Sequence, residues 1–153
     1  MDTGLEIPRD YIYRMEELKL TELEKAFFEK EEVVYDLLKE KKIEQAKEVM
    51  NEILALFEFP YCEESLFYLL IEGIVNVCIE EELYEFANKY VGLLFVSGKR
   101  RADDGQRELI AARLAYAQGN YWVAKEFAHI RYVKSEGTGL KRNKELAKLL
   151  KEK

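Results

Sequence analysis

Apolar side chains recur at intervals of three and four residues along most of this chain, which is the spacing of one buried face on an α-helix. The stretch from residue 63 to residue 80 is apolar on most sides, as is typical of a helix in the centre of a stack. Thr21 followed by Glu24 has the spacing of a capping box, so one helix is expected to begin there. The pattern predicts helices over residues 10–20, 21–40, 43–57, 63–80, 83–95, 105–118, 121–134 and 143–152.

Gly119 and Asn120 form the clearest boundary, because one helix ends there and the next begins at once on Tyr121. A connection this short is typical of two antiparallel neighbouring helices. Small side chains lie on both sides of the turn, where two such helices must approach closely: Ala111, Ala112, Ala115, Ala124 and Ala128. The segment therefore predicts a helical hairpin. Before it, Asp103 and Asp104 are expected to cap the helix that leads into the turn.

The second helix of each of three predicted pairs carries an alanine: Ala46, Ala87 and Ala124. An apolar residue precedes each alanine by three positions: Ile43, Tyr84 and Tyr121. The hairpin with Ala112, Gly119-Asn120-Tyr121 and Ala124 resembles a tetratricopeptide repeat. The alanines are 41 and 37 residues apart, longer than the roughly 34 residues of that repeat. The resemblance implies an all-α fold, a tetratricopeptide-like stack of three antiparallel helix pairs with extra N- and C-terminal helices, in one domain over residues 1–153.

The segment from Asp103-Asp104-Gly105-Gln106 through Gly119-Asn120 to Gly137 resembles the C-terminal part of small bacterial tetratricopeptide-like proteins. Some of these are immunity proteins of polymorphic toxin systems. The resemblance implies a non-catalytic protein that binds and blocks a cognate toxin domain. A chaperone or adaptor of the same fold, holding an extended segment of a secretion substrate, is the alternative.

Composition is consistent with one globular domain in the cytoplasm. The chain has 153 residues, of which 48% are hydrophobic, and this excludes a disordered chain. The first eight residues lack the basic start and apolar run of a signal peptide, and no apolar run of about 18 residues could span a membrane. Cys62 and Cys78 have neither the spacing nor the companions of a zinc site, so we expect two reduced thiols.

Acidic and basic side chains are unevenly distributed. Residues 1–98 carry 23 Asp/Glu and 10 Lys/Arg, whereas residues 99–153 carry 7 Asp/Glu and 14 Lys/Arg. The interval between Lys47 and Lys89 contains ten glutamates and no Lys or Arg. Such a field repels the phosphates of nucleic acid and attracts a basic protein partner. The alternative is that these glutamates only cover solvated helix faces, since glutamate is a good helix former.

In a tetratricopeptide stack the first helix of each pair lines the concave face. Alignment on the three alanines places the following partner-binding residues on that face: Glu31, Tyr35, Glu64, Tyr68, Glu72, Asn76, Glu80, Gln106, Arg113 and Tyr116. The five between residues 64 and 80 are four apart, so they form one slanting row. Carboxylates with aromatic residues favour a segment rich in Lys and Arg. The alternative is that Glu72 and Asn76 form hydrogen bonds with neighbouring helices.

The patterns that carry catalysis are missing, so we expect no enzyme and no cofactor. Gly137-Thr-Gly139 lacks the strand and the spacing of a phosphate-binding loop. His129 has basic neighbours and no nucleophile in its sequence context. Consecutive residues on a helix, such as those from Glu80 to Glu82, do not face one point, which disfavours a metal site. Trp122 is expected to pack between the last hairpin and the closing helix, the alternative being an exposed anchor at an interface.

Overall fold

The computed structural model describes residues 22–57, 65–96 and 104–152, and within these ranges every regular element is helical. The described elements are α2 (Glu22–Lys39), α3 (Ile43–Leu56), α4 (Ser65–Glu81), α5 (Tyr84–Tyr90), the 3₁₀ helix η2 (Val91–Phe95), α6 (Gln106–Ala117), α7 (Tyr121–Lys134) and α8 (Lys144–Lys151). The all-α prediction is confirmed. The helix expected at residues 10–20, the cap at Thr21 and the candidate residue Glu64 lie outside the described residues.

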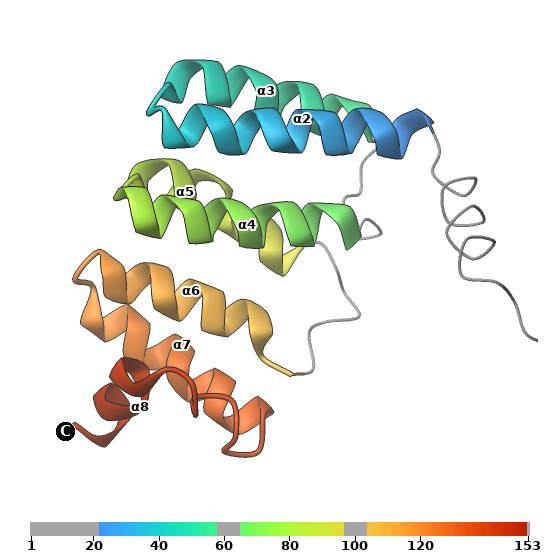
Figure 1. Ribbon diagram of the computed structural model, residues 1–153. Helices are drawn as coiled ribbons and strands as arrows, with labels where there is room; N and C mark the ends of the chain where they lie inside the picture. Colours follow the sequence, from blue (N-terminus) through green and yellow to red (C-terminus); the bar gives the residue numbers. More distant parts are fainter. Residues whose placement is uncertain (1–21, 58–64, 97–103, 153) are drawn as a thin grey trace, which may run out of the picture.

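Three helices follow one another through the molecule, each beside a second helix. Figure 1 shows α2 beside α3, α4 beside α5, and α6 beside α7. α2 packs on both α3 and α4, and α4 packs in turn on α5, η2 and α6. α6 makes its most extensive contacts with α7, and α8 covers both. α4 is therefore central, as its apolar sequence predicted, and most of its core residues are fully buried: Phe67, Tyr68, Leu70, Ile71, Ile74, Val75 and Cys78.

The turns between paired helices share one backbone geometry. In each turn one residue has a left-handed conformation: Lys41 with φ 60°, Glu82 with φ 58° and Gly119 with φ 80°. The next residue donates its N–H to the carbonyl five positions earlier: Lys42 to Leu37 at 2.9 Å, Leu83 to Cys78 at 2.8 Å, and Asn120 to Ala115 at 2.9 Å. This is the long hydrogen bond of a Schellman motif, which closes a helix end. The second helices then begin at Ile43, Tyr84 and Tyr121.

The small residues expected at helix crossings are all buried. Ala46, Ala87 and Ala124 have no exposed surface. Ala111, Ala112, Ala115 and Ala128 are also buried, and Ala112, Ala115 and Ala128 share one core cluster with Ala124. A methyl group at such positions lets two backbones approach, because ridges on one helix can enter shallow grooves on the other. The predicted close approach at this hairpin is confirmed.

Two local expectations were wrong or incomplete. The α-helix expected through residue 95 ends at Tyr90 and continues as the 3₁₀ helix η2, where Val91 and Gly92 are weaker helix formers than most residues. Asp104 accepts the N–H of Gln106 at 2.9 Å, but the N-cap position of α6 is Gly105, which forms no side-chain cap hydrogen bond. The expected cap by Asp104 is therefore only partly realised, and Asp103 lies outside the described residues.

Trp122 is not packed under the closing helix, because 77% of its surface is exposed. The buried side of α7 is formed by Ala124 and Ala128. Two residues advance an α-helix by more than half a turn, so Trp122 lies on the side opposite Ala124. The expectation of a buried tryptophan is therefore corrected, and the residue belongs to the outer surface of α7.

Candidate functional site

The surface shared by α2, α4 and α6 brings most of the expected binding residues together. We call it the first-helix face and define it by Glu31, Tyr35, Glu72, Asn76, Glu80, Gln106, Arg113 and Tyr116. Glu80 is exposed and the other seven are half-buried. These side chains come from three helices that are successive neighbours in Figure 1, so the face runs across all three.

Side chains of α4 and α6 are cross-linked by two hydrogen bonds on this face. Gln106 donates from Nε2 to Oε1 of Glu72 at 3.0 Å. Arg113 donates from Nη1 to Oδ1 of Asn76 at 2.7 Å. Of the two sequence interpretations, the one in which Glu72 and Asn76 bond to a neighbouring helix is therefore the one observed. Partial burial of these polar groups is stabilised by partners from the next helix.

Tyr35 lies at the contact between α2 and α4. Its hydroxyl donates to the carbonyl oxygen of Leu70 over 3.5 Å, a long hydrogen bond. A Cβ atom at Gly73 would be 2.1 Å from the Tyr35 hydroxyl oxygen, closer than two such atoms can approach. Gly73 is therefore required for the phenol ring to lie against α4, and this contact positions Tyr35 between the carboxylates of both helices.

Negative charge is concentrated around Tyr35. Burial raises the pKa of Glu31 above its ordinary value of 4.5. Burial raises the pKa of Tyr35 most, and the nearby charges of Glu31 and Glu72 raise it further. Among the described residues, no Lys or Arg forms an ion pair with Glu31 or Glu72. Two carboxylates thus share this part of the face with a phenol and without a compensating cation, which favours the approach of a positive group.

Two exposed apolar side chains on this face were missed by the sequence reasoning. Phe28 is 43% exposed and Leu69 is 46% exposed. Phe28 precedes Tyr35 by seven residues and Leu69 precedes Asn76 by seven, so each shares a helix face with a candidate residue. That spacing could have identified both, but an apolar residue on an amphipathic helix is normally assigned to the core.

Tyr68 does not belong to the first-helix face, which corrects the expectation for this residue. It has no exposed surface and packs in the main core. Four residues advance an α-helix by about 40° beyond one full turn, so the row from Tyr68 through Glu72 to Glu80 winds around α4. One end of the row therefore enters the core while the other reaches solvent. Glu64, the first member of that row, lies outside the described residues.

The face is bordered by the start of α8. A small cavity of about 170 Å³ lies between the C-terminal part of α4, α6 and the residues around Asn143. Arg113 and Tyr116 line it, and the ring centroid of Tyr116 is 5.0 Å from that of Tyr121. The chemistry of the whole face is that of recognition, with acidic, amide and aromatic groups. In the described ranges, no group of three or more His, Cys, Asp or Glu side chains could hold a metal ion.

Comparison with protein-family models, with curated proteins and with solved structures gave no match for this chain. None of the helices described here combines the length and the apolar character needed to cross a membrane. The function must therefore be argued from the geometry and charge of the first-helix face itself.

Proposed function

We propose that the helices form a tetratricopeptide-like stack of three antiparallel pairs, α2 with α3, α4 with α5, and α6 with α7. The proposal is supported by the left-handed backbone conformation that recurs at one position of each turn, at Lys41, Glu82 and Gly119. It is also supported by the buried alanine at the fourth residue of each second helix: Ala46, Ala87 and Ala124. Repetition of one turn and one small contact residue is the behaviour of a stacked repeat.

We further propose that the chain is a non-enzymatic protein-binding module, and that it acts as an immunity protein. It would bind a basic toxin domain through the first-helix face and cover that domain's active site. The observation that carries this proposal is the pair of carboxylates, Glu31 and Glu72, that flank Tyr35 without a described cationic partner. Lys or Arg side chains of a partner would form charge-assisted hydrogen bonds with both carboxylates.

The remaining features of the face support a protein partner over a small cation. Phe28 and Leu69 expose apolar surface on the same helix faces as the carboxylates. Removal of this apolar surface from water on binding supplies affinity. The surrounding charges orient the partner and increase the association rate. The net charge of −6 for the chain would add long-range attraction for a basic domain.

The test is co-expression with the cognate toxin domain, sought among the products of the neighbouring genes, with bacterial growth as the readout. We expect the parent protein to restore growth and the Glu31→Lys/Glu72→Lys variant to lose protection. The matched control is Glu48→Lys/Glu85→Lys, which makes the same charge change at exposed positions on the second helices α3 and α5. Equal protection by both variants would show that the toxin binds outside the first-helix face. Absence of protection by the parent protein would refute the immunity function.

The exposed apolar residues Phe28 and Leu69 also favour the alternative, a chaperone or adaptor that holds an extended segment. Such a segment would place alternating apolar and basic side chains on this face. Calorimetric titration with peptides from a neighbouring secreted protein separates the two functions. Binding of a short peptide, in the absence of a folded domain, supports the chaperone, whereas binding of only the folded toxin domain supports immunity.

A further inference from the structure

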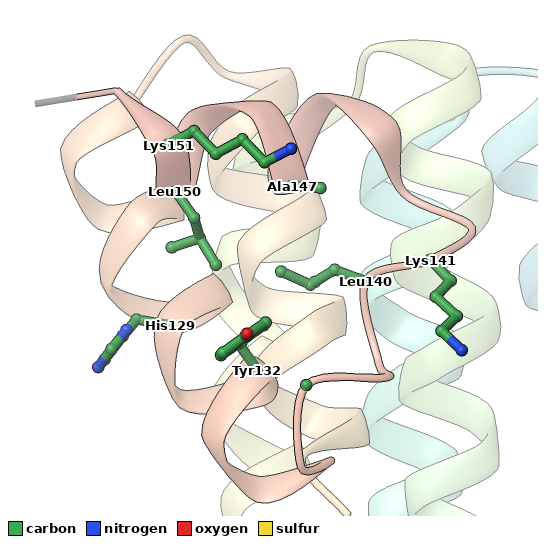
Figure 2. Close-up of a pocket in the computed structure, with 8 residues that line it drawn as sticks. His129, Tyr132, Leu140, Lys141, Ala147, Leu150 and Lys151 are labelled. Atoms are coloured by element: carbon green, nitrogen blue, oxygen red, sulfur yellow. The ribbon is translucent and has the colours of Figure 1, made fainter.

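A second concave site lies at the C-terminal end of the molecule, on residues that the first-helix face does not use. It is a cavity of about 400 Å³ between α7, the segment at residues 135–143 and α8. Its lining residues are His129, Tyr132, Gly137, Leu140, Lys141, Ala147, Leu150 and Lys151. Figure 2 shows Tyr132, Leu140 and Leu150 around one space that is bounded by α7, the loop and α8. The volume is within the range of small-molecule sites, near its lower end.

The chemistry of the cavity is divided between an apolar interior and a basic border. Tyr132, Leu140 and Leu150 converge on one another in Figure 2, whereas Lys141 and Lys151 lie around them on separate segments. In the part of the chain that the structure describes, neither lysine forms an ion pair with a carboxylate. In Figure 2 the Lys151 side chain runs past Ala147, whereas the Lys141 side chain points away from Leu140 and Leu150. Lys151 is therefore the cation that an anion at the mouth of the cavity can reach.

The loop wall of the cavity is held in place by hydrogen bonds to α7. Ser135 Oγ donates to the carbonyl oxygen of Arg131 at 2.7 Å and accepts the N–H of Gly139 at 2.7 Å. Arg131 donates from Nε to the carbonyl oxygen of Gly139 at 3.3 Å. A Cβ atom at Gly139 would be 2.2 Å from Arg131 Nε, so only glycine allows this close packing. The site is preformed, which lowers the entropic cost of binding a ligand.

We propose that this cavity binds a small amphipathic carboxylate, with its aliphatic chain among Tyr132, Leu140 and Leu150 and its carboxylate at Lys151. The apolar walls select the chain because burial of each methylene is favourable. Lys151 selects the anion and disfavours a cation of the same length. This inference does not depend on the proposed immunity function, since the cavity shares no residue with the first-helix face.

The probe is octanoate, titrated into the whole protein by calorimetry, with amide chemical shifts recorded in parallel. We expect saturable binding with a dissociation constant of roughly 1 mM or tighter, as suits a ligand of this size. Shifts are expected to concentrate in residues 137–141 and 147–151. Octanol, which keeps the chain and lacks the charge, is expected to bind at least about tenfold more weakly, and octylammonium is expected not to bind.

Two variants of α8 test the basic border at equal net charge. Lys151→Glu is expected to weaken octanoate binding by at least about tenfold, the factor that loss of a hydrogen bond to a charged group produces. Lys148→Glu changes an exposed lysine of the same helix that does not line the cavity, and is expected to change affinity by less than about threefold. Equal effects of the two variants would overturn the assignment of the carboxylate to this border.

Ala147→Leu tests the cavity itself, because a larger side chain at this lining position occupies the space of the ligand chain. Leucine is a good helix former, so α8 is expected to persist, and thermal unfolding checks this. Octanoate affinity is expected to fall at least about tenfold while the unfolding temperature is maintained. Absence of saturable octanoate binding to the parent, or unchanged binding to Ala147→Leu, would refute the proposal.

Discussion

At the residue scale, Glu108 carries a carboxylate into the interior between α6 and α7, where only 4% of the residue is exposed. Lys134 Nζ lies 2.6 Å from Glu108 Oε1, and Arg107 Nε lies 3.7 Å from the same oxygen. Sequence spacing cannot indicate this contact, because residues 108 and 134 are on different helices. The ion pair links the start of α6 to the end of α7 through a carboxylate that is buried between the two helices.

Lys134→Met is expected to lower the free energy of unfolding by about 2–3 kcal/mol, because it leaves the buried Glu108 without its nearest cation. Lys144→Met, at an exposed position, is expected to change it by less than about 0.5 kcal/mol. Urea denaturation followed by circular dichroism measures both. If the two variants lose equal stability, the Glu108–Lys134 pair does not stabilise the fold.

Cys78 is the second informative residue, because its thiol is fully buried in the main core. Burial raises the pKa of Cys78 from 9.0 to about 12, while a backbone hydrogen bond at Ala87 lowers it slightly. The thiolate is the reactive form of cysteine. Both the low accessibility and the raised pKa therefore protect the side chain from alkylation and oxidation.

In a Cys62→Ala variant, which keeps Cys78 as its one thiol, we expect reaction with a disulfide reagent at pH about 8 to be slow and to become fast in urea. The native state holds the Cys78 proton more tightly than the unfolded state does. The free energy of unfolding is therefore expected to fall as pH rises from 9.0 towards about 12. Rapid labelling of the folded protein would contradict the burial of this thiol.

At the element scale, the repeated turns differ in how well their residues suit the backbone. Gly119 adopts φ 80° without a steric penalty, whereas Lys41 and Glu82 adopt φ near 60° with a Cβ atom present. A left-handed conformation costs an ordinary residue on the order of 1–2 kcal/mol. The turns at Lys41 and Glu82 therefore adopt the same conformation as the turn at Gly119 at a cost in conformational free energy. The packing of the helices on either side of each turn offsets this cost.

Glu82→Gly is expected to raise the free energy of unfolding by about 0.5–1 kcal/mol, since relief of the left-handed strain exceeds the greater freedom of glycine in the unfolded chain. Gly119→Ala is expected to lower it by about 1 kcal/mol for the converse reason. Thermal or urea unfolding of the two variants gives the measurement. A loss of stability in Glu82→Gly would show that the left-handed conformation is not a strain at this turn.

At the scale of the whole molecule, packing of α4 against α2 and α6 brings together charges that are distant in the sequence. Glu31 and Glu72 are 41 residues apart, and both act on the pKa of Tyr35. An unpaired carboxylate in partly buried surroundings favours its protonated form, and a cation placed beside it favours the charged form. Binding of a basic partner to this face should therefore be linked to pH.

We expect affinity for a basic partner to increase as pH rises through the range in which Glu31 loses its proton, above 4.5. The partner's cation lowers the pKa of Glu31, so the complex binds fewer protons than the free protein and protons are released on association. Calorimetry in buffers with different ionisation enthalpies measures this release between mildly acidic and neutral pH. Glu31→Gln should remove most of it, and an unchanged proton release in that variant would exclude Glu31 as its source.

The sequence by itself determined the helices, because the period of apolar residues fixes which side of each helix is buried without reference to its partner. It also determined the turn at Gly119-Asn120 and the buried positions of Ala46, Ala87 and Ala124. Placement of Glu31 and Tyr35 on one side of α2 followed from the same spacing, since residues four apart share a helix face.

Only the tertiary structure decided how those faces meet. Tyr68 enters the core because the row on α4 winds around its axis, and Trp122 is exposed because α7 packs through its alanines. Periodicity cannot show that α6 supplies the partners of Glu72 and Asn76, or that Lys134 reaches Glu108. Such contacts depend on the distance and angle between packed helices, which several side chains fix together and no single segment encodes.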